Sequence, residues 1–344
     1  MTTMELRQLT ETPEYDFLRT NEHLKGKIMF LTLGGSHAYG TNIEGSDVDI
    51  RGCALNSAHD LIGYGNFEQV IDKTTDTTVY AFNKLINLLV SCNPNTIELL
   101  GCKPEHYFVL SDLGRQMIEN RKLFLSRAAV NSFGGYANQQ LRRLENAIAR
   151  DKLGQGEKEE HILGSLRRSV LSFEDRYDNL PEGSIKLYTV PSQKEDMEIE
   201  VVGDINLKGY PARGFAGIIN DLNSTIRDYE KLSHRNKKKD DARLNKHAMH
   251  LIRLYLTGLD ILEKGEIITY RGDDLELLMS IRNGTFQNED GTYREEFFDM
   301  VNVYEQRLKY AAENTSLPKT PDLKKVEEFV MEVNRVALKM DSAA

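Results

Sequence analysis

The sequence has few cysteines, no long apolar run and no excess of positive charge, and each shortage excludes a class of protein. Cys53, Cys92 and Cys102 are odd in number and lack the paired spacing of a zinc site, so neither a disulfide framework nor a cysteine-based metal centre is indicated. We expect reduced, buried thiols. No run approaches the roughly 20 apolar residues of a membrane span, and residues 1–18 are polar and acidic. The sequence therefore predicts no membrane association and a cytoplasmic location.

The charge and composition narrow the class further. The formal net charge is −9, so any contact with nucleic acid has to come from a local basic patch, and a protein that coats DNA is disfavoured. Hydrophobic residues make up 40% and charged residues 28%, without a low-complexity tract, as in soluble globular proteins. A length of 344 residues is enough for two domains and for the burial of most of the apolar surface.

The first part of the chain has a mixed α/β pattern. Apolar or alternating runs predict strands over residues 27–33, 46–53 and 75–82. Helical periodicity follows over residues 84–91 and 112–126, with Asp112 as the expected N-cap of the second helix. We therefore predict a domain of mixed sheet and helices over residues 1–130.

The rest of the chain, residues 131–344, is predicted to form a mainly helical domain. Apolar residues recur at helical spacing over residues 132–150, 157–179, 215–232, 241–264 and 295–313. Two short β-like runs, 184–190 and 197–202, are separated by a turn that contains proline, so a small hairpin is expected near residues 184–203. The predicted fold class is α+β, with a mixed sheet first and helices after it.

The most informative segment follows the first predicted strand. Gly34 and Gly35 permit a tight turn in which backbone N–H groups and the Ser36 hydroxyl bind phosphate oxygens. Asp47 and Asp49 are one residue apart on a predicted strand, so both carboxylates should project from one face and offer hard oxygen ligands to magnesium. A Gly-Gly-Ser alone is usually a flexible turn, and an Asp-x-Asp alone is usually a solvated strand edge. The combination is what points to a phosphate and metal site.

With this combination the sequence resembles the nucleotidyltransferase superfamily that includes DNA polymerase β, whose hallmark is a Gly-Ser turn followed by a strand with two carboxylates. It also resembles the predicted nucleotidyltransferases of bacteria and phages that include an RNA-ligase-associated group. The matching segments are residues 34–41, 46–52, 93–100, 246–254 and 281–284. The resemblance implies a polymerase β-like palm, an RNA repair setting and the transfer of a nucleoside monophosphate, and it implies little about the acceptor.

A two-metal mechanism follows from these residues. Two Mg²⁺ ions, with Mn²⁺ as an alternative, are expected to be bridged by Asp47 and Asp49 and to assist in-line displacement of pyrophosphate. The third carboxylate should come from the next strand. Asp76 is the preferred residue because a β-branched and aromatic run follows it, and Asp72 and Glu68 are the alternatives.

Further candidates for nucleotide binding lie near the glycine turn. The turn itself offers Gly34, Gly35, Ser36, His37 and Tyr39. His37 either donates to phosphate or faces solvent. Arg51 follows the carboxylates and either binds phosphate or pairs with one of them. Lys84 either reaches the triphosphate or is an ordinary surface lysine.

In the helical half, Lys246, His250 and Arg253 fall at helical spacing and share one predicted helix face. Three cationic side chains on one stripe predict an anion site that faces the cleft between the domains. The alternative is a solvated basic face that pairs with Asp240 or Glu263. Because the resembling segment covers this helix, we include these residues among the expected nucleotide ligands.

Two functions remain to be separated. The first is an enzyme that transfers a monophosphate from a nucleoside triphosphate such as ATP to a hydroxyl of RNA, for example a tRNA-like molecule, or of a protein or small molecule. The second is a catalytically idle, antitoxin-like interaction protein on the same fold. Loss of Asp47 or Asp49 would favour the second, and both are present. A template-directed polymerase is disfavoured, because no helix-hairpin-helix element is recognisable and the net charge is acidic.

Overall fold

The computed structural model describes residues 2–152, residues 183–223 except 194–198, 213 and 221, residues 241–343, and a few isolated positions between 156 and 180. The chain forms two compact units. The first comprises Met1–Asn138, Met249–Ile281 and Phe298–Ala344, and the second comprises Gln139–Ala248 and Arg282–Phe297. The predicted division at residue 130 does not coincide with these units, because the chain returns to the first unit twice.

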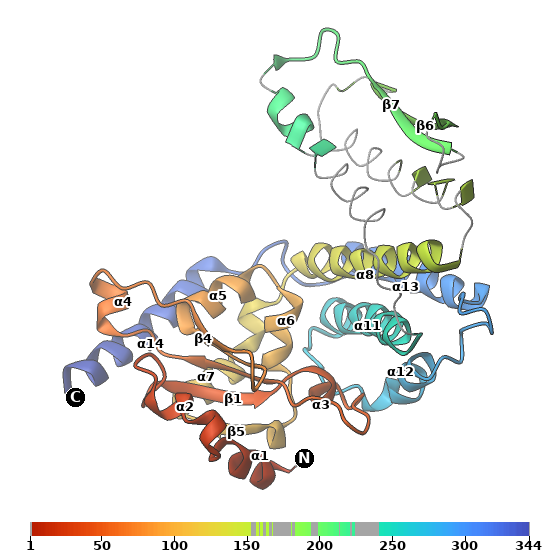
Figure 1. Cartoon of the computed structure of the whole chain (residues 1–344). Coiled ribbons are helices and arrows are strands. Elements are labelled where there is room, and N and C mark those ends of the chain that lie inside the picture. Colours follow the sequence, from red (N-terminus) through yellow and green to blue (C-terminus); the bar gives the residue numbers. More distant parts are fainter. Residues whose placement is uncertain are drawn as a thin grey trace. The chain divides into compact units, whose positions relative to one another are not determined.

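The first unit is built on one mixed sheet (Figure 1). Its strands are β1 (Ile28–Leu33), β2 (Ile50–Ala54), β3 (Gln69–Asp72), β4 (Thr77–Ala81) and β5 (Tyr107–Leu110), in the spatial order β3-β4-β2-β1-β5. Strand β1 is antiparallel to β2 and β5, whereas β2 and β4 are parallel. The end of β1 and the starts of β2 and β4 therefore lie at the same edge of the sheet.

Short helices connect and cover these strands. They are α1 (Thr3–Thr10), α2 (Phe17–Thr20), α3 (Gly35–Tyr39), α4 (Ala58–Ile62), α5 (Phe82–Val90), α6 (Pro94–Ile97) and α7 (Asp112–Glu119), with 3-10 turns at Pro13–Tyr15, Glu98–Leu100, Pro104–His106 and Arg121–Phe124. The expected cap of α7 is wrong by one position. Ser111 has extended backbone angles and accepts a hydrogen bond from the Gly114 N–H, which makes it the N-cap in place of Asp112.

The end of the chain completes the core of the first unit. Helix α14 (Leu323–Ala343) packs on α5, where the rings of Phe329 and Phe82 lie 6.1 Å apart and Asn334 donates to Asn83 at 3.1 Å. Phe82 is fully buried. Figure 1 shows α14 running beside α5 and α4. A segment more than two hundred residues away in sequence thus supports α5, the helix that directly follows β4.

The remaining helices largely follow the sequence pattern. They are α8 (Ala128–Lys152), α11 (Asp241–Leu259), which continues as a π-helical turn over Asp260–Lys264, a 3-10 turn at Gly272–Asp274, α12 (Leu275–Arg282) and α13 (Glu295–Asn314). The helices expected over 157–179 and 215–232 lie largely outside the described residues.

The predicted hairpin is confirmed. Strands β6 (Ile185–Pro191) and β7 (Ile199–Ile205) pair in antiparallel register. Among the described helices, none combines the length and apolar character that crossing a bilayer requires.

Candidate active site

The glycine segment that follows β1 begins a helix instead of forming a bare turn, which corrects the sequence prediction. Gly34 is the N-cap of α3 and its N–H donates to the Asp49 carbonyl at 2.8 Å. Gly35 has a positive φ of 54°, and a Cβ atom there would lie 1.8 Å from Asp49 Oδ2. A residue with a side chain is therefore excluded at position 35 for both reasons. The glycine lets the Asp49 carboxylate rest directly on the backbone.

The two aspartates precede β2 and do not alternate along it, so the predicted strand over 46–53 starts too early. The chain first closes a turn in which the Ser46 N–H donates to the Ile43 carbonyl at 3.0 Å and the Ile43 N–H donates to Ser46 Oγ at 2.9 Å. Asp47 follows this turn and is exposed, whereas Asp49 is half-buried beside Gly35. Of the pair, Asp49 is the one fixed at the sheet edge.

Asp76 lies next to Asp49 because β2 and β4 are parallel and start together. The sequence predicts a strand over 75–82 that would include Asp76. In the structure Asp76 directly precedes β4 and has a left-handed φ of 44°, so it is a turn residue. The Ile50 N–H donates to the Asp76 carbonyl at 3.3 Å. Ile50 on β2 is paired with Thr77 on β4. The position immediately before each strand therefore carries an aspartate.

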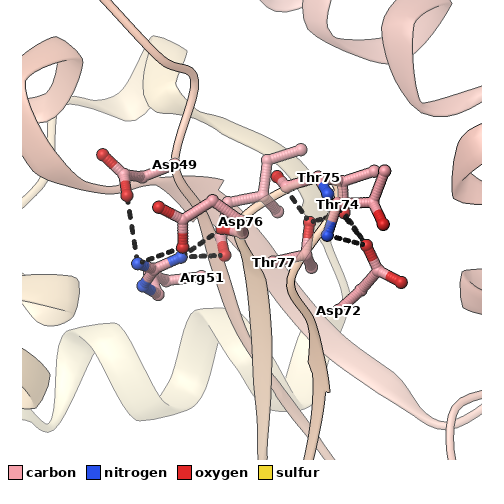
Figure 2. A network of polar contacts seen from close by, with 8 residues as sticks. Asp49, Arg51, Asp72, Thr74, Thr75, Asp76 and Thr77 are labelled. Carbon is pink, nitrogen blue, oxygen red and sulfur yellow. Dashed lines mark hydrogen bonds and ion pairs between the residues drawn. The ribbon is translucent and has the colours of Figure 1, made fainter.

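Arg51 joins the two carboxylates (Figure 2). Its Nη2 lies 3.1 Å from Asp49 Oδ1 and 3.0 Å from Asp76 Oδ1. Its Nη1 donates to the Ile50 carbonyl at 2.9 Å and also to the Asp76 carbonyl. The sequence leaves two roles for Arg51, phosphate binding or pairing with an aspartate, and in this structure Arg51 pairs with the aspartates.

The carboxyl groups of Asp49 and Asp76 are close enough to influence one another directly. A hydrogen bond with the Asp49 side chain, followed by the charge and hydrogen bond of Arg51, lowers the pKa of Asp76 against the opposing effect of burial. Two carboxylates in direct contact need a shared proton or a cation between them, and Arg51 supplies a positive charge here. Such a pair of hard oxygen ligands fits Mg²⁺ or Mn²⁺. Within the described residues, however, no group of three or more metal-ligating side chains is already gathered.

The alternative third carboxylates have other partners. Asp72 Oδ1 accepts from the Thr74 and Thr75 N–H groups at 3.0 and 2.8 Å and from Thr75 Oγ1 at 2.9 Å (Figure 2). These hydrogen bonds, with that of the Thr75 backbone strongest, lower the pKa of Asp72. Glu68 pairs with Lys84 at 3.1 Å. That ion pair gives Lys84 a partner other than a triphosphate.

A cavity of about 310 Å³ opens beside Asp49 and Arg51. Its walls are formed by Leu33, Gly34, Gly35, Ala38, Tyr39, Asp49, Arg51, Thr78, Tyr80, Asn95, Glu98, Leu99, Cys102 and Thr269. The size is at the lower end of the range for small-molecule sites. Sequence reasoning missed several of these lining residues, including Asn95, Glu98 and Thr269. The matching segment 93–100 was a signal for Asn95 and Glu98, whereas Thr269 has no local signal.

Tyr39 and Glu98 form the floor of the cavity and belong to a buried ionic cluster with Arg253. The Tyr39 hydroxyl donates to Glu98 Oε2 at 2.7 Å, and Arg253 donates to Glu98 Oε1. The Arg253 guanidinium also lies 3.7 Å from the centre of the Tyr39 ring. The side chains of Glu98 and Arg253 are each 4% exposed. Burial raises the pKa of Tyr39 well above its ordinary value, so the phenol stays protonated and donates.

Several of the predicted nucleotide ligands lie elsewhere. Arg253 is buried behind Glu98 and does not line the cavity, so its expected place at a cleft surface is wrong. Lys246 is exposed and belongs to the second unit, and His250 is half-buried. The three side chains do not share one exposed stripe, because a helix face that meets a protein core buries its cations against acidic partners.

Near the glycines, two more expectations change. His37 lies with Nε2 3.3 Å from the Ser46 carbonyl, so its ring meets the turn before Asp47. Neither His37 nor Ser36 is among the described residues that line the cavity. Of the glycine segment, Gly34, Gly35 and Tyr39 do line it.

A strand that leads into a glycine-started helix, with aspartates just before the two neighbouring strands, agrees with the polymerase β-like palm that the sequence resemblance implies. Residues 9–154 match RlaP, the RNA repair pathway DNA polymerase beta family. The matched residues include every strand of the large sheet. Neither the curated proteins nor the solved structures give a match to this chain.

Proposed function

We propose that the protein transfers a nucleoside monophosphate from a nucleoside triphosphate to a hydroxyl group in RNA. The observation that carries this proposal is that Asp49 lines one cavity with the Gly34–Gly35 backbone and is joined through Arg51 to Asp76. Carboxylate oxygens suit the divalent cations that accompany a nucleotide, and the backbone N–H groups of glycines suit its phosphates. The family description, which names RNA repair, supports RNA as the acceptor.

Asp49 and Asp76 would hold divalent cations, Mg²⁺ or Mn²⁺, and exposed Asp47 would join them as the third carboxylate. Bound cations of this kind neutralise phosphate charge and favour ionisation of an attacking hydroxyl. In the reaction, the acceptor oxygen forms a bond to the α-phosphorus while the bond from that phosphorus to the pyrophosphate oxygen breaks. The hydroxyl proton passes to solvent, and pyrophosphate leaves with the bonding electrons.

The chain's own residues provide positioning around this centre. The backbone of Gly34 and Gly35 lines the cavity and can approach phosphate oxygens closely because neither residue has a side chain. Tyr80, Asn95 and Leu99 line the same cavity and offer an aromatic ring, an amide and an apolar surface to a nucleoside. The binding of the triphosphate thus extends from the glycines towards these three residues.

The acceptor site must be local, because the formal net charge of −9 repels a polyanion on average. A tRNA-like RNA is the first acceptor to test, and a protein hydroxyl is the second. An antitoxin-like partner that binds nucleotide without chemistry is the competing outcome.

The experiment incubates the purified protein with each α-labelled nucleoside triphosphate, Mg²⁺ or Mn²⁺, and total RNA or total protein. Asp49→Asn and Asp76→Asn are the test variants, and Asp72→Asn is the matched control because that carboxylate is held in its own turn. We expect label in RNA with the wild type and the control, and none with the test variants. Label in neither fraction under any condition would favour the idle interaction protein.

A further inference from the structure

Arg51 places a positively charged side chain directly beside the candidate metal ligands. It is a β2 residue paired with Thr32 on β1 and with Thr78 on β4, so its backbone is fixed in the middle of the sheet. Its side chain is 23% exposed. A Cβ atom on Gly34 would lie 2.9 Å from Arg51 Cγ, so the stem of the arginine passes directly over the glycine that begins α3.

The guanidinium uses oxygen atoms that a divalent cation would need. Arg51 Nη2 contacts Asp49 Oδ1 at 3.1 Å and Asp76 Oδ1 at 3.0 Å, while Asp49 Oδ2 rests against Gly35. A cation bound between the two aspartates would meet a positive charge already held there. Arginine does not deprotonate in proteins, so this charge can leave only by rotation of the side chain.

The cavity offers the guanidinium a second partner. Arg51 lines it together with Gly34 and Gly35, where the proposed function puts the triphosphate. Guanidinium groups bind phosphate with paired hydrogen bonds as readily as they bind carboxylate. A rotation about the stem that leaves the aspartates keeps the guanidinium beside the glycine backbone, because the stem is confined there.

We propose that Arg51 is an exchangeable counter-ion, which neutralises Asp49 and Asp76 in the metal-free protein and moves to the nucleotide phosphates when a divalent cation takes its place. The inference rests on the proposed function, since it assumes that this site takes cations and a triphosphate. Metal and nucleotide then bind cooperatively: the metal releases Arg51 to the nucleotide, and the nucleotide holds Arg51 away from the metal ligands.

The first arm of the test measures Mn²⁺ binding without nucleotide, by electron paramagnetic resonance of the free ion, for the wild type and Arg51→Met. Removal of the competing charge should tighten Mn²⁺ binding about tenfold, equal to about 1.4 kcal/mol. Arg307→Met is the matched control. Arg307 forms a two-pronged ion pair with Glu263, at 2.8 and 2.6 Å, so the variant loses the same charge outside the cavity and should bind Mn²⁺ as the wild type does.

The second arm measures binding of a non-hydrolysable triphosphate analogue in the presence of saturating Mn²⁺, by calorimetry. Arg51→Met should now bind about tenfold more weakly than the wild type, because the phosphate contact is lost. The opposite signs of the two effects are the signature of an exchanging cation. A residue that only supports the fold weakens both, and a residue that only binds phosphate leaves Mn²⁺ binding unchanged; either result overturns the proposal.

Arg51→Lys is the second variant if the methionine variant does not fold. Lysine keeps the charge but lacks the planar fork that bridges both carboxylates, so its changes should have the same two signs and a smaller size. Failure of the proposed function is a separate result. In that case the wild type and all variants bind neither Mn²⁺ nor the analogue, whereas failure of this inference leaves wild-type binding intact.

Discussion

Replacement of Arg253 tests how the cavity floor is held together. Arg253→Met removes the cation from a pair in which both side chains are 4% exposed, and it also removes the guanidinium that lies 3.7 Å from the Tyr39 ring. Breaking a buried pair by deleting one partner costs about 3–5 kcal/mol, because the remaining charge has no compensation. An exposed pair would cost only about 0.2–1 kcal/mol. Because this pair is buried, we expect the larger loss of stability.

The assay is urea unfolding followed by far-ultraviolet circular dichroism, with the transition of the first unit as the observable. We expect Arg253→Met to lower the free energy of unfolding by about 3–5 kcal/mol with little change in the denaturant slope. The matched control is Arg253→Met combined with Glu98→Gln, in which no buried charge remains. It should recover much of the loss, because the Tyr39 hydroxyl can still donate to the glutamine oxygen.

Three results would contradict a structural role of the buried Glu98–Arg253 pair. A loss within about 1 kcal/mol for the single variant would mean that the pair behaves as if exposed to water. A double variant that is less stable than the single one would mean that the charge of Glu98 is not the cause. Weaker nucleotide binding without loss of stability would restore the surface role that the helical spacing of Arg253 predicts.

The other predictions concern the sheet edge and its neighbouring turn. Gly35→Ala should abolish transfer and triphosphate binding, because the new Cβ would lie 1.8 Å from Asp49 Oδ2; binding at wild-type strength in calorimetry would contradict this. Asp47→Asn should abolish transfer with thermal stability unchanged or higher, since it removes an exposed negative charge from a carboxylate-rich edge. The hydrogen bonds of its turn lower the pKa of Asp72 in the folded protein. The ionised carboxylate therefore stabilises the fold above the ordinary aspartate pKa of about 3.9, and this stabilisation is lost as the pH falls through the lower pKa of the folded protein. Acid unfolding of Asp72→Asn should therefore show a weaker pH dependence below about pH 4, and an unchanged acid limb would count against the assignment.

Local pattern was sufficient for the elements that begin the site. The apolar run before Gly34 predicts β1, and the helical spacing after Ala81 predicts α5. The pattern failed where turns decide the backbone. Gly45 has a positive φ of 78° and the turn before Asp47 delays β2, so strict alternation from Ser46 does not describe how the aspartates are held.

The cavity floor was out of reach of sequence reasoning for a different reason. Glu98 contacts Arg253 and Thr269, which are 155 and 171 positions away along the chain. Periodicity places Arg253 on a helix face, but it carries no information on which segment covers that face. The same limit applies to α14, whose contact with α5 joins the end of the chain to its first third.

Nucleotidyl transfer itself can be measured by double-label stoichiometry. The wild type is incubated with RNA, Mg²⁺ and a nucleoside triphosphate labelled on the α-phosphate, and in parallel with one labelled on the γ-phosphate. We expect α-label in RNA and γ-label in pyrophosphate in equal amounts, with both lost in Asp49→Asn. Transfer of the γ-label to RNA, release of inorganic phosphate alone, or full activity of Asp49→Asn would contradict this expectation.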